Sequence, residues 1–340
     1  MKLMRTEEAV GQMLCHDITQ IIPGKVKGPV FRKGHIITEA DIPVLLSVGK
    51  DHVYIWENDE TMVHENDAAQ ILYELCCSEH MHPSEVKEGK IELIADCDGL
   101  LKIDREKLHA INALGEMMIA CRHGDFPVKK GDKIAGTRII PLIIQKEKME
   151  RAKEAAPGGR IFRILPWQEK RVGIVTTGNE VYYGRIEDKF TPVIIRKVEE
   201  YGAEVIGHEI CSDDHEMITA AIRKLLDAGA TMVLCTGGMS VDPDDRTPLA
   251  IRNTGARIVS YGAPVLPGAM FLLSYYGEND IPIVGLPGCV MYAKRTVFDL
   301  VLPRLIAGDL VEKEDLDRLG EGGLCLNCDV CTYPNCGFGK

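Results

Sequence analysis

Hydrophobic and polar positions follow two different rhythms along the chain, and the change falls between residues 145 and 160. Beyond residue 170, apolar runs of strand length alternate with segments in which apolar residues recur every three to four positions. The run RVGIVTTG (171–178) is typical of a parallel strand buried on both faces, whereas residues 217–226 have the spacing of an amphipathic helix. This alternation predicts an open α/β sheet with helices on both faces.

The same pattern gives approximate bounds for each element and for four parts of the chain. Strands are expected at 171–178, 203–210, 231–235 and 282–288, and helices at 191–202, 215–228 and 292–302. Thr191 is the expected N-cap of the first of these helices, with Pro192 in its first turn. Upstream, short β-rich runs and two helical segments, near 61–77 and 104–122, predict a mixed α+β region.

These patterns divide the chain as follows. We expect an accessory α+β region at 1–150, a linker at 151–169, a mostly parallel α/β domain at 170–310 and a short tail at 320–340.

Composition and charge narrow the classes of function. The chain has 340 residues, 45% of them hydrophobic, so it can bury a sizeable core. A net charge of −11 without a long run of Lys and Arg argues against nucleic-acid or membrane-surface binding. The start of the sequence shows no apolar segment of signal-peptide length, and no stretch is long enough to cross a bilayer, so a cytoplasmic protein is expected.

Three glycine-bearing loops follow three of the expected strands directly. They are TTGNE (176–180), TGGMS (236–240) and LPGC (286–289). Glycine lets backbone amides approach a ligand, and the start of a following helix favours an anion. In an open α/β sheet such loops gather at the carboxyl ends of the strands, so a phosphate-binding face is expected there, although tight turns alone also require glycine.

Acidic residues beside the second loop change this picture. Asp242, Asp244 and Asp245 would repel a bare phosphate, but a bound Mg²⁺ lets carboxylates and phosphate share one site. Each acid also has a purely structural explanation: aspartate before proline is common in turns, and Asp245 could cap a helix that starts near Thr247. Asp213, with Glu216 three residues later, fits a capping box, which leaves Asp214 as a first-turn charge.

Five segments in this order resemble one known domain family. TTGNEVYYG, SDDHEMI, TGGMSVDPDDRTPLA, PVLPGAM and GLPGCVMYA are similar to the molybdopterin-binding (MoaB/Mog-type) domain of molybdenum-cofactor biosynthesis. The resemblance covers roughly residues 170–308. Molybdopterin adenylyltransferases, molybdopterin molybdotransferases and competence-damage-inducible nucleotide hydrolases share this domain, whose fold is a three-layer α/β sandwich.

The resemblance implies roles for individual residues of the cleft. Thr236, Gly237, Gly238 and Ser240 would hold the terminal phosphate of the pterin, and Asp245 would help to place Mg²⁺ and the reacting group. Asp213 and Asp214 match a second acidic loop. We therefore expect Asp245 and Asp214 as catalytic residues, and Asp213, Asp242 and Asp245 as magnesium ligands. The remaining pterin contacts would come from Gly178, Glu180, Pro287 and Gly288.

The sequence also departs from the family pattern. Family members usually carry Lys around a PGKP-like turn, but here Val265 and Leu266 precede the Pro-Gly pair and Ala269 and Met270 follow it. In IEDKF (186–190) the asparagine of a DSN-like segment is replaced. A cationic donor for phosphate or molybdate is therefore missing, and binding is better supported by the sequence than turnover.

Four cysteines crowd into the C-terminal segment GLCLNCDVCTYPNCGFGK. Cys325, Cys328, Cys331 and Cys336 have the spacing C-x2-C-x2-C-x4-C, and the segment is too short and Gly-rich to build a core. Chance cysteines or a labile disulfide are the simpler alternatives. The paired x2 spacings favour an iron–sulfur cluster, and Zn²⁺ on four thiolates also satisfies the count.

These observations leave three functions open. The first is a molybdotransferase-like enzyme that inserts molybdate into adenylylated molybdopterin with release of AMP. The second is a non-catalytic protein that binds or delivers molybdopterin, with the tail contacting a molybdenum enzyme or another cofactor-assembly protein. The third is a nucleotide pyrophosphatase-type hydrolase. Domains of this family often associate, so a homo-oligomer is consistent with all three.

Overall fold

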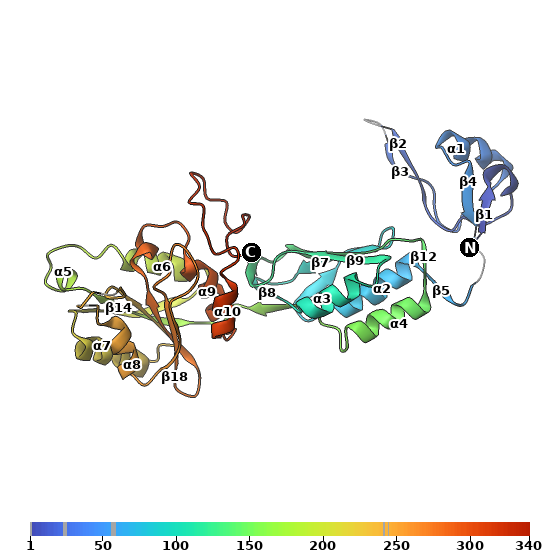
Figure 1. Ribbon diagram of the computed structural model, residues 1–340. Coiled ribbons are helices and arrows are strands. Elements are labelled where there is room, and N and C mark those ends of the chain that lie inside the picture. The colour runs from blue at the N-terminus through green and yellow to red at the C-terminus, as the bar shows by residue number, and fades with distance from the viewer. Residues whose placement is uncertain (1, 23–25, 56–58, 241, 244) are drawn as a thin grey trace. The chain divides into compact units, whose positions relative to one another are not determined.

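The computed structural model describes residues 2–22, 26–55, 59–240, 242–243 and 245–340, and Figure 1 shows its elements. Asp244, one of the expected acids, lies outside the described residues. The chain forms two compact units. One comprises residues 1–94, 104–121 and 133–161, and the other comprises residues 95–103, 122–132 and 162–340.

A six-stranded sheet is the centre of the second unit, with strand order β15-β14-β16-β19-β18-β17. The first four strands in this order run parallel, and β18 and β17 run antiparallel to their neighbours. The strands span Arg171–Thr177 (β14), Glu204–Cys211 (β15), Met232–Thr236 (β16), Arg257–Tyr261 (β17), Leu272–Tyr276 (β18) and Ile281–Leu286 (β19). This confirms the expected open, mostly parallel sheet.

Two separate hydrophobic cores cover the two faces of this sheet. Along β16, Met232 and Leu234 belong to the core that includes α6 and α9, whereas Val233 and Cys235 belong to the core that includes α7 and α8. The alternation follows from the two-residue period of a strand. The helices span Asn179–Tyr182 (α5), Thr191–Glu199 (α6), His215–Asp227 (α7), Thr247–Asn253 (α8), Val297–Ile306 (α9) and Lys313–Arg318 (α10). The result is the three-layer α/β sandwich that the sequence predicts.

A small second sheet, of order β10-β8-β13, belongs to the same unit. Its strands span Gly99–Ile103 (β8), Phe126–Val128 (β10) and Phe162–Pro166 (β13), so β13 lies inside the range expected as a linker. Helix α4, Lys146–Ala155, also enters that range.

The first unit is a mixed α+β structure. Its helices are Ile42–Ser47 (α1), Glu65–Cys76 (α2) and Arg105–Asn112 (α3), together with α4. Its strands are Lys2–Arg5 (β1), Ile18–Ile22 (β2), Val26–Phe31 (β3), His52–Ile55 (β4), Met62–His64 (β5), Met81–Pro83 (β6), Lys90–Ala95 (β7), Met117–Cys121 (β9), Lys133–Ile139 (β11) and Ile143–Gln145 (β12).

Two local expectations were wrong. The helix expected at 104–122 ends at Asn112, because residues 117–121 form β9 and pair with β11. Thr191 is the first residue of α6 rather than its N-cap. Its backbone amide donates a hydrogen bond to the carboxylate of Asp188 at 3.1 Å. Pairing with β11 overrode the helix propensity of residues 117–121, and the carboxylate of Asp188 took the capping role expected of Thr191.

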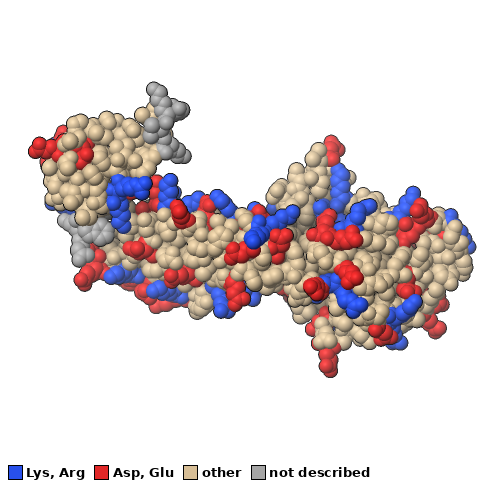
Figure 2. All heavy atoms as spheres, turned by 180° about the vertical axis from the view of Figure 1, so that it is seen from behind, with Lys and Arg blue, Asp and Glu red and all other residues tan. Residues whose placement is uncertain are grey.

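Across the described residues, none of the helices combines the length and the apolar character needed to cross a membrane. On the face shown in Figure 2, acidic and basic side chains are intermingled.

Candidate functional site

The three glycine loops meet at one edge of the large sheet. Thr176 of β14 lies opposite Thr236 of β16, which in turn lies opposite Leu286 of β19. All three strands are parallel, so the loops that follow these residues leave the sheet side by side at its carboxyl edge. The predicted clustering of the loops is therefore present in the structure.

The first two loops touch each other through glycine. Gly237 has φ +86°, and a Cβ at this position would lie 2.2 Å from the carbonyl oxygen of Thr177. Gly238 also has positive φ, and its Cβ would lie 2.9 Å from Oγ1 of Thr247. Only glycine satisfies both the backbone conformation and this close approach. The glycines hold the backbones of the two loops in direct contact.

Side-chain hydroxyl groups hold the second glycine loop, residues 236–240, in place. Thr247, at the start of α8, donates its side-chain hydroxyl to the carbonyl of Gly237 at 2.9 Å. Its hydroxyl also lies 3.2 Å from that of Thr177. Tyr261 donates its hydroxyl to the carbonyl of Met239 at 2.8 Å. The loop is thus hydrogen-bonded to two separate elements, α8 through Thr247 and β17 through Tyr261, which fixes its position.

The acidic residues occupy two loops at this edge. Asp245 accepts a hydrogen bond from the amide of Asp242 at 3.0 Å, so these two residues close one turn. Asp213 accepts from the amide of Asn179 at 2.9 Å, which ties the second acidic loop to the first glycine loop. Asp214 is the N-cap of α7 and accepts from the amide of Met217 at 2.8 Å. The expected capping role therefore belongs to Asp214 and not to Asp213.

Tyr261, which contacts the TGGMS loop, has a raised pKa. Partial burial, followed by the charge of Asp245, raises the pKa of Tyr261. Tyr261 donates to the carbonyls of Met239 and Ser240, so it joins β17 to the TGGMS loop. The carbonyl of Gly238 accepts from the amide of Thr247 at 3.2 Å, two residues after Asp245, and the role of Asp245 beside this loop stays a prediction.

The other expected cleft residues differ in accessibility. Ser240, Gly288 and Glu180 are exposed, whereas Pro287 is buried. The Glu180 carboxyl group folds back over Gly178, where an added Cβ would lie 2.9 Å from Oε1.

A partly buried polar network lies beneath the loops, and sequence analysis missed it. Thr176 Oγ1 lies 2.8 Å from Thr191 Oγ1 and 3.0 Å from His208 Nε2, and it accepts from Thr236 Oγ1 at 3.3 Å. Asp188 accepts from the hydroxyl of Thr191 at 2.6 Å. Thr236 is fully buried, so its hydroxyl serves this network. Asp188 could have been found from its place three residues before Thr-Pro. An aspartate there can accept hydrogen bonds from the amides at the start of the helix.

The charge of Asp188 is stabilised by its partners. Burial acts to raise the pKa of Asp188, but hydrogen bonds from the hydroxyl and amide of Thr191 and from the amide of Phe190 outweigh it, so the pKa is lowered. Asp188 is therefore an ionised carboxylate that fixes the start of α6 close to the end of β14.

The sequence predicts a magnesium ion at the carboxylates of this edge. Among the described residues, no group of three or more His, Cys, Asp and Glu side chains lies close enough together to hold a metal ion. Mg²⁺ is commonly held by one or two carboxylates, with substrate phosphate and water completing its coordination. Asp213, Asp242 and Asp245 do not form such a group among the described residues, and their role as magnesium ligands stays a prediction.

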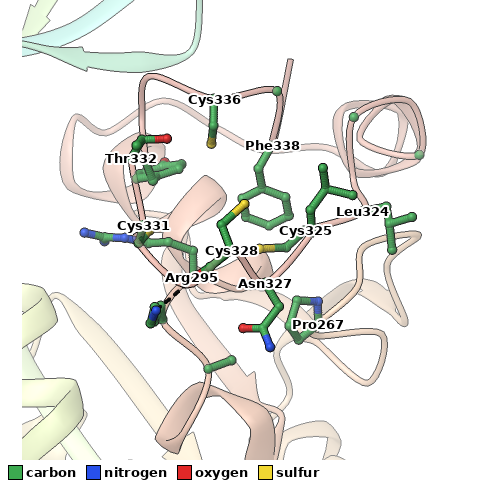
Figure 3. A pocket seen from close by; sticks show the side chains of 17 residues that line it. Pro267, Arg295, Leu324, Cys325, Asn327, Cys328, Cys331, Thr332, Cys336 and Phe338 are labelled. Carbon is green, nitrogen blue, oxygen red and sulfur yellow. Dashed lines mark hydrogen bonds between the residues drawn. The ribbon is translucent and has the colours of Figure 1, made fainter.

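The cysteine tail packs against the same unit. Leu266 donates its amide to the carbonyl of Gly323 at 2.8 Å and accepts from the amide of Cys325 at 2.8 Å. The four tail cysteines line one cavity of about 270 Å³ (Figure 3). All four are free thiols.

Family comparison matches two segments of the chain. A domain of unknown function matches residues 3–57, and a probable molybdopterin binding domain matches residues 173–307. The second match contains all three glycine loops and both acidic loops. The chain carries a domain of the molybdopterin-binding family. This confirms the family resemblance seen in the sequence motifs.

Curated relatives match parts of this chain. The molybdopterin molybdenumtransferase of Synechococcus elongatus is 25% identical over 149 residues, which are 42% of this chain and 37% of the relative. A CinA-like protein of Mycobacterium avium is 39% identical over 77 residues, 23% of this chain and 18% of the relative. The chain thus spans well under half the length of these relatives.

Solved structures similar to parts of this chain include two proteins of molybdopterin biosynthesis. The molybdopterin biosynthesis enzyme MoaB of Thermus thermophilus is 25% identical, covers 41% of this chain and 97% of its own, and has a TM-score of 0.34. A molybdopterin biosynthesis MoeA protein of Pyrococcus horikoshii is 15% identical, covers 74% of this chain and 81% of its own, and has a TM-score of 0.35.

Proposed function

We propose that the molybdopterin-binding domain of this chain binds adenylylated molybdopterin and takes part in molybdenum-cofactor biosynthesis. In the enzymatic form of this proposal, molybdate joins the dithiolene while AMP is released. The observation that carries the proposal is the contact between two glycine loops at Gly237 and Thr177, with acidic residues bonded beside it.

The loops supply binding without a protein nucleophile. Residues 236–240 bring backbone amides to the carboxyl edge of the sheet, where a phosphate can accept hydrogen bonds. Asp242 and Asp245 on one side and Asp213 on the other would hold Mg²⁺. The cation, when bound, supplies neutralising charge for the phosphate and the molybdate oxyanion. Asp214 caps α7 and so positions the adjacent Asp213.

A carrier without turnover is the second candidate, and the loop 264–270 favours it. Where family members carry lysines, Val265 is buried and the backbone of Leu266 is bonded to the tail. No cationic side chain is present in this loop to compensate an oxyanion. A pyrophosphatase-type hydrolase remains the third candidate, since CinA-like proteins are among the relatives.

One assay separates these functions. The full chain is incubated with adenylylated molybdopterin, molybdate and Mg²⁺, and pterin binding and AMP release are followed by fluorescence and chromatography. The test variant is Asp245→Asn. The matched control is Glu278→Gln, which removes an exposed charge in the turn between β18 and β19, at the opposite edge of the sheet.

The expected result for the enzyme is molybdate-dependent AMP release that Asp245→Asn abolishes and Glu278→Gln retains. Binding without AMP release supports the carrier, and AMP release that does not require molybdate supports the hydrolase. A wild-type chain that binds neither molybdopterin nor its adenylylated form contradicts the proposal.

A further inference from the structure

The tail joins the sheet at the same edge as the glycine loops. Leu272, the first residue of β18, pairs with Gly285 near the end of β19. The loop that precedes β18 therefore leaves the sheet where β19 ends, beside the LPGC loop. Leu266 in that loop forms a bridge with Leu324 of the tail. The tail is thus a fixed part of the domain at this edge.

Further contacts hold the rest of the tail in place. Lys294 donates to the carbonyls of Cys328 and Asp329 at 3.1 and 2.6 Å, and the hydroxyl of Tyr333 donates to the carbonyl of Asp299 in α9 at 3.1 Å. Phe338 is 4% exposed within the core. A segment with such anchors is ordered around its cysteines even though it contains no helix or strand among its described residues.

The cysteines line one common cavity. Cys325 and Cys336 are half-buried and Cys328 and Cys331 are exposed, and all four contribute to a hollow of about 270 Å³. Figure 3 shows the thiols spread around this hollow, with Phe338 forming part of its wall. The cavity opens among the four thiols, where a group larger than one atom has room.

Zinc and an iron–sulfur cluster require different arrangements of four thiols. Zinc requires four sulfurs at about 2.3 Å from a single ion. Within the described part of the chain no three such ligands converge on one point in this way. An iron–sulfur cluster places its four cysteine ligands on different iron atoms, so the sulfurs stay farther apart and the cluster fills the space between them. The C-x2-C-x2-C-x4-C spacing of the tail, with its two consecutive x2 steps, favours the cluster over zinc.

The walls of the cavity also suit a negatively charged cluster. Lys294 and Arg295 line it, and none of its described lining residues is acidic. Arg295 lies over the ring of Tyr333 at 4.8 Å, which fixes the cation at the wall. A cluster held by four thiolates carries net negative charge, which nearby cations and a partly apolar wall stabilise.

We infer that Cys325, Cys328, Cys331 and Cys336 bind one [4Fe–4S] cluster in this cavity, at the edge of the sheet that carries the glycine loops. Each thiol releases its proton to solvent as it binds one iron atom, so ligation involves no change in oxidation state of the cysteines. The inference does not depend on the identity of the ligand in the cleft.

The test uses the full chain, purified without oxygen and incubated with sulfide and equal amounts of ferrous and ferric iron, which supply the oxidation level of a [4Fe–4S]²⁺ core without a further oxidant. Iron, acid-labile sulfide and zinc are measured per chain, and the reduced sample is examined by electron paramagnetic resonance. The double variant Cys328→Ser/Cys331→Ser removes two exposed ligands, so loss of folding is not expected. Cys97→Ser, which changes a half-buried thiol outside the tail, is the matched control.

The expected result is about four iron and four sulfide per chain in the wild type and in Cys97→Ser, with a cluster signal that disappears in the double variant. Alkylation followed by mass spectrometry should show the tail thiols protected only in the loaded wild type and control. A colourless chain that retains one zinc, or iron that persists in the double variant, overturns the inference. Neither outcome bears on pterin binding, so this test and that of the proposed function fail independently.

Discussion

Replacing Gly237 with alanine tests whether the contact between the two glycine loops positions the ligand. The change adds one methyl group at φ +86°, directed at the carbonyl of Thr177 from 2.2 Å. Neither group is the end of a flexible side chain, so one of the two loops must move. Ordinary contact requires a shift of about 1 Å.

Two costs follow, and they can be separated. The left-handed backbone conformation costs a residue with a Cβ about 1–2 kcal/mol of folding stability. A displacement of about 1 Å in a site that orients reacting groups reduces the rate by about 100-fold, or weakens binding if the protein is only a carrier. The loss of stability is expected at any glycine with positive φ, whereas the loss of activity or binding is expected only at this loop.

Gly255→Ala is the control that isolates the second cost. Gly255 has φ +89°, and nothing lies within 4 Å of where its Cβ would be. Urea unfolding should show a loss of about 1–2 kcal/mol in Gly255→Ala and at least that loss in Gly237→Ala. Titration with adenylylated molybdopterin and the AMP-release assay should show a large defect in Gly237→Ala alone.

Two results would refute this reasoning. One is wild-type binding and AMP release in Gly237→Ala, which would mean that the loop contact does not position the ligand. The other is an equal functional defect in Gly255→Ala, which would assign the effect to general destabilisation.

Two further substitutions and one alkylation experiment test other features of the domain. Asp188→Ala should lower the free energy of unfolding by about 1–2 kcal/mol. Because the pKa of Asp188 is lowered in the folded state, this difference from wild type should be constant above pH 3.8 and shrink as the pH falls through the folded-state pKa. Urea unfolding across that pH range measures it. Lys197→Met leaves buried Asp299 without its lysine and should cost near the lower end of about 3–5 kcal/mol in urea unfolding, because an arginine still contacts it; an unchanged midpoint would contradict this. In the metal-free chain, exposed Cys328 should be alkylated well before Cys235, whose pKa is raised by complete burial, as mass spectrometry can follow.

The sheet and the clustering of its glycine loops at one edge could be predicted because their signals are local. The buried strands β14, β16 and β19 are continuous apolar runs, and a glycine follows each within two residues. Chain alternation then places the loops at one edge. The antiparallel strands β17 and β18 gave no comparable signal, since their pairing depends on partners brought together only by the folded chain.

The interior of the site was harder to predict than its loops. The network of Thr176, Thr191, Asp188 and His208 joins residues up to 32 positions apart, and no periodicity marks such a set. The one-residue shift of the cap from Asp213 to Asp214 has a similar origin, because Asp213 is taken by the amide of Asn179 from another loop. Tertiary partners decided which of two adjacent acids caps the helix.

Calorimetric titration of the full chain with adenylylated molybdopterin, with and without Mg²⁺, tests the central claim most directly. The account predicts saturable binding of one ligand per chain that is strengthened by Mg²⁺ and lost in Asp245→Asn. Absence of binding in both conditions, or binding that neither Mg²⁺ nor Asp245→Asn alters, would contradict it.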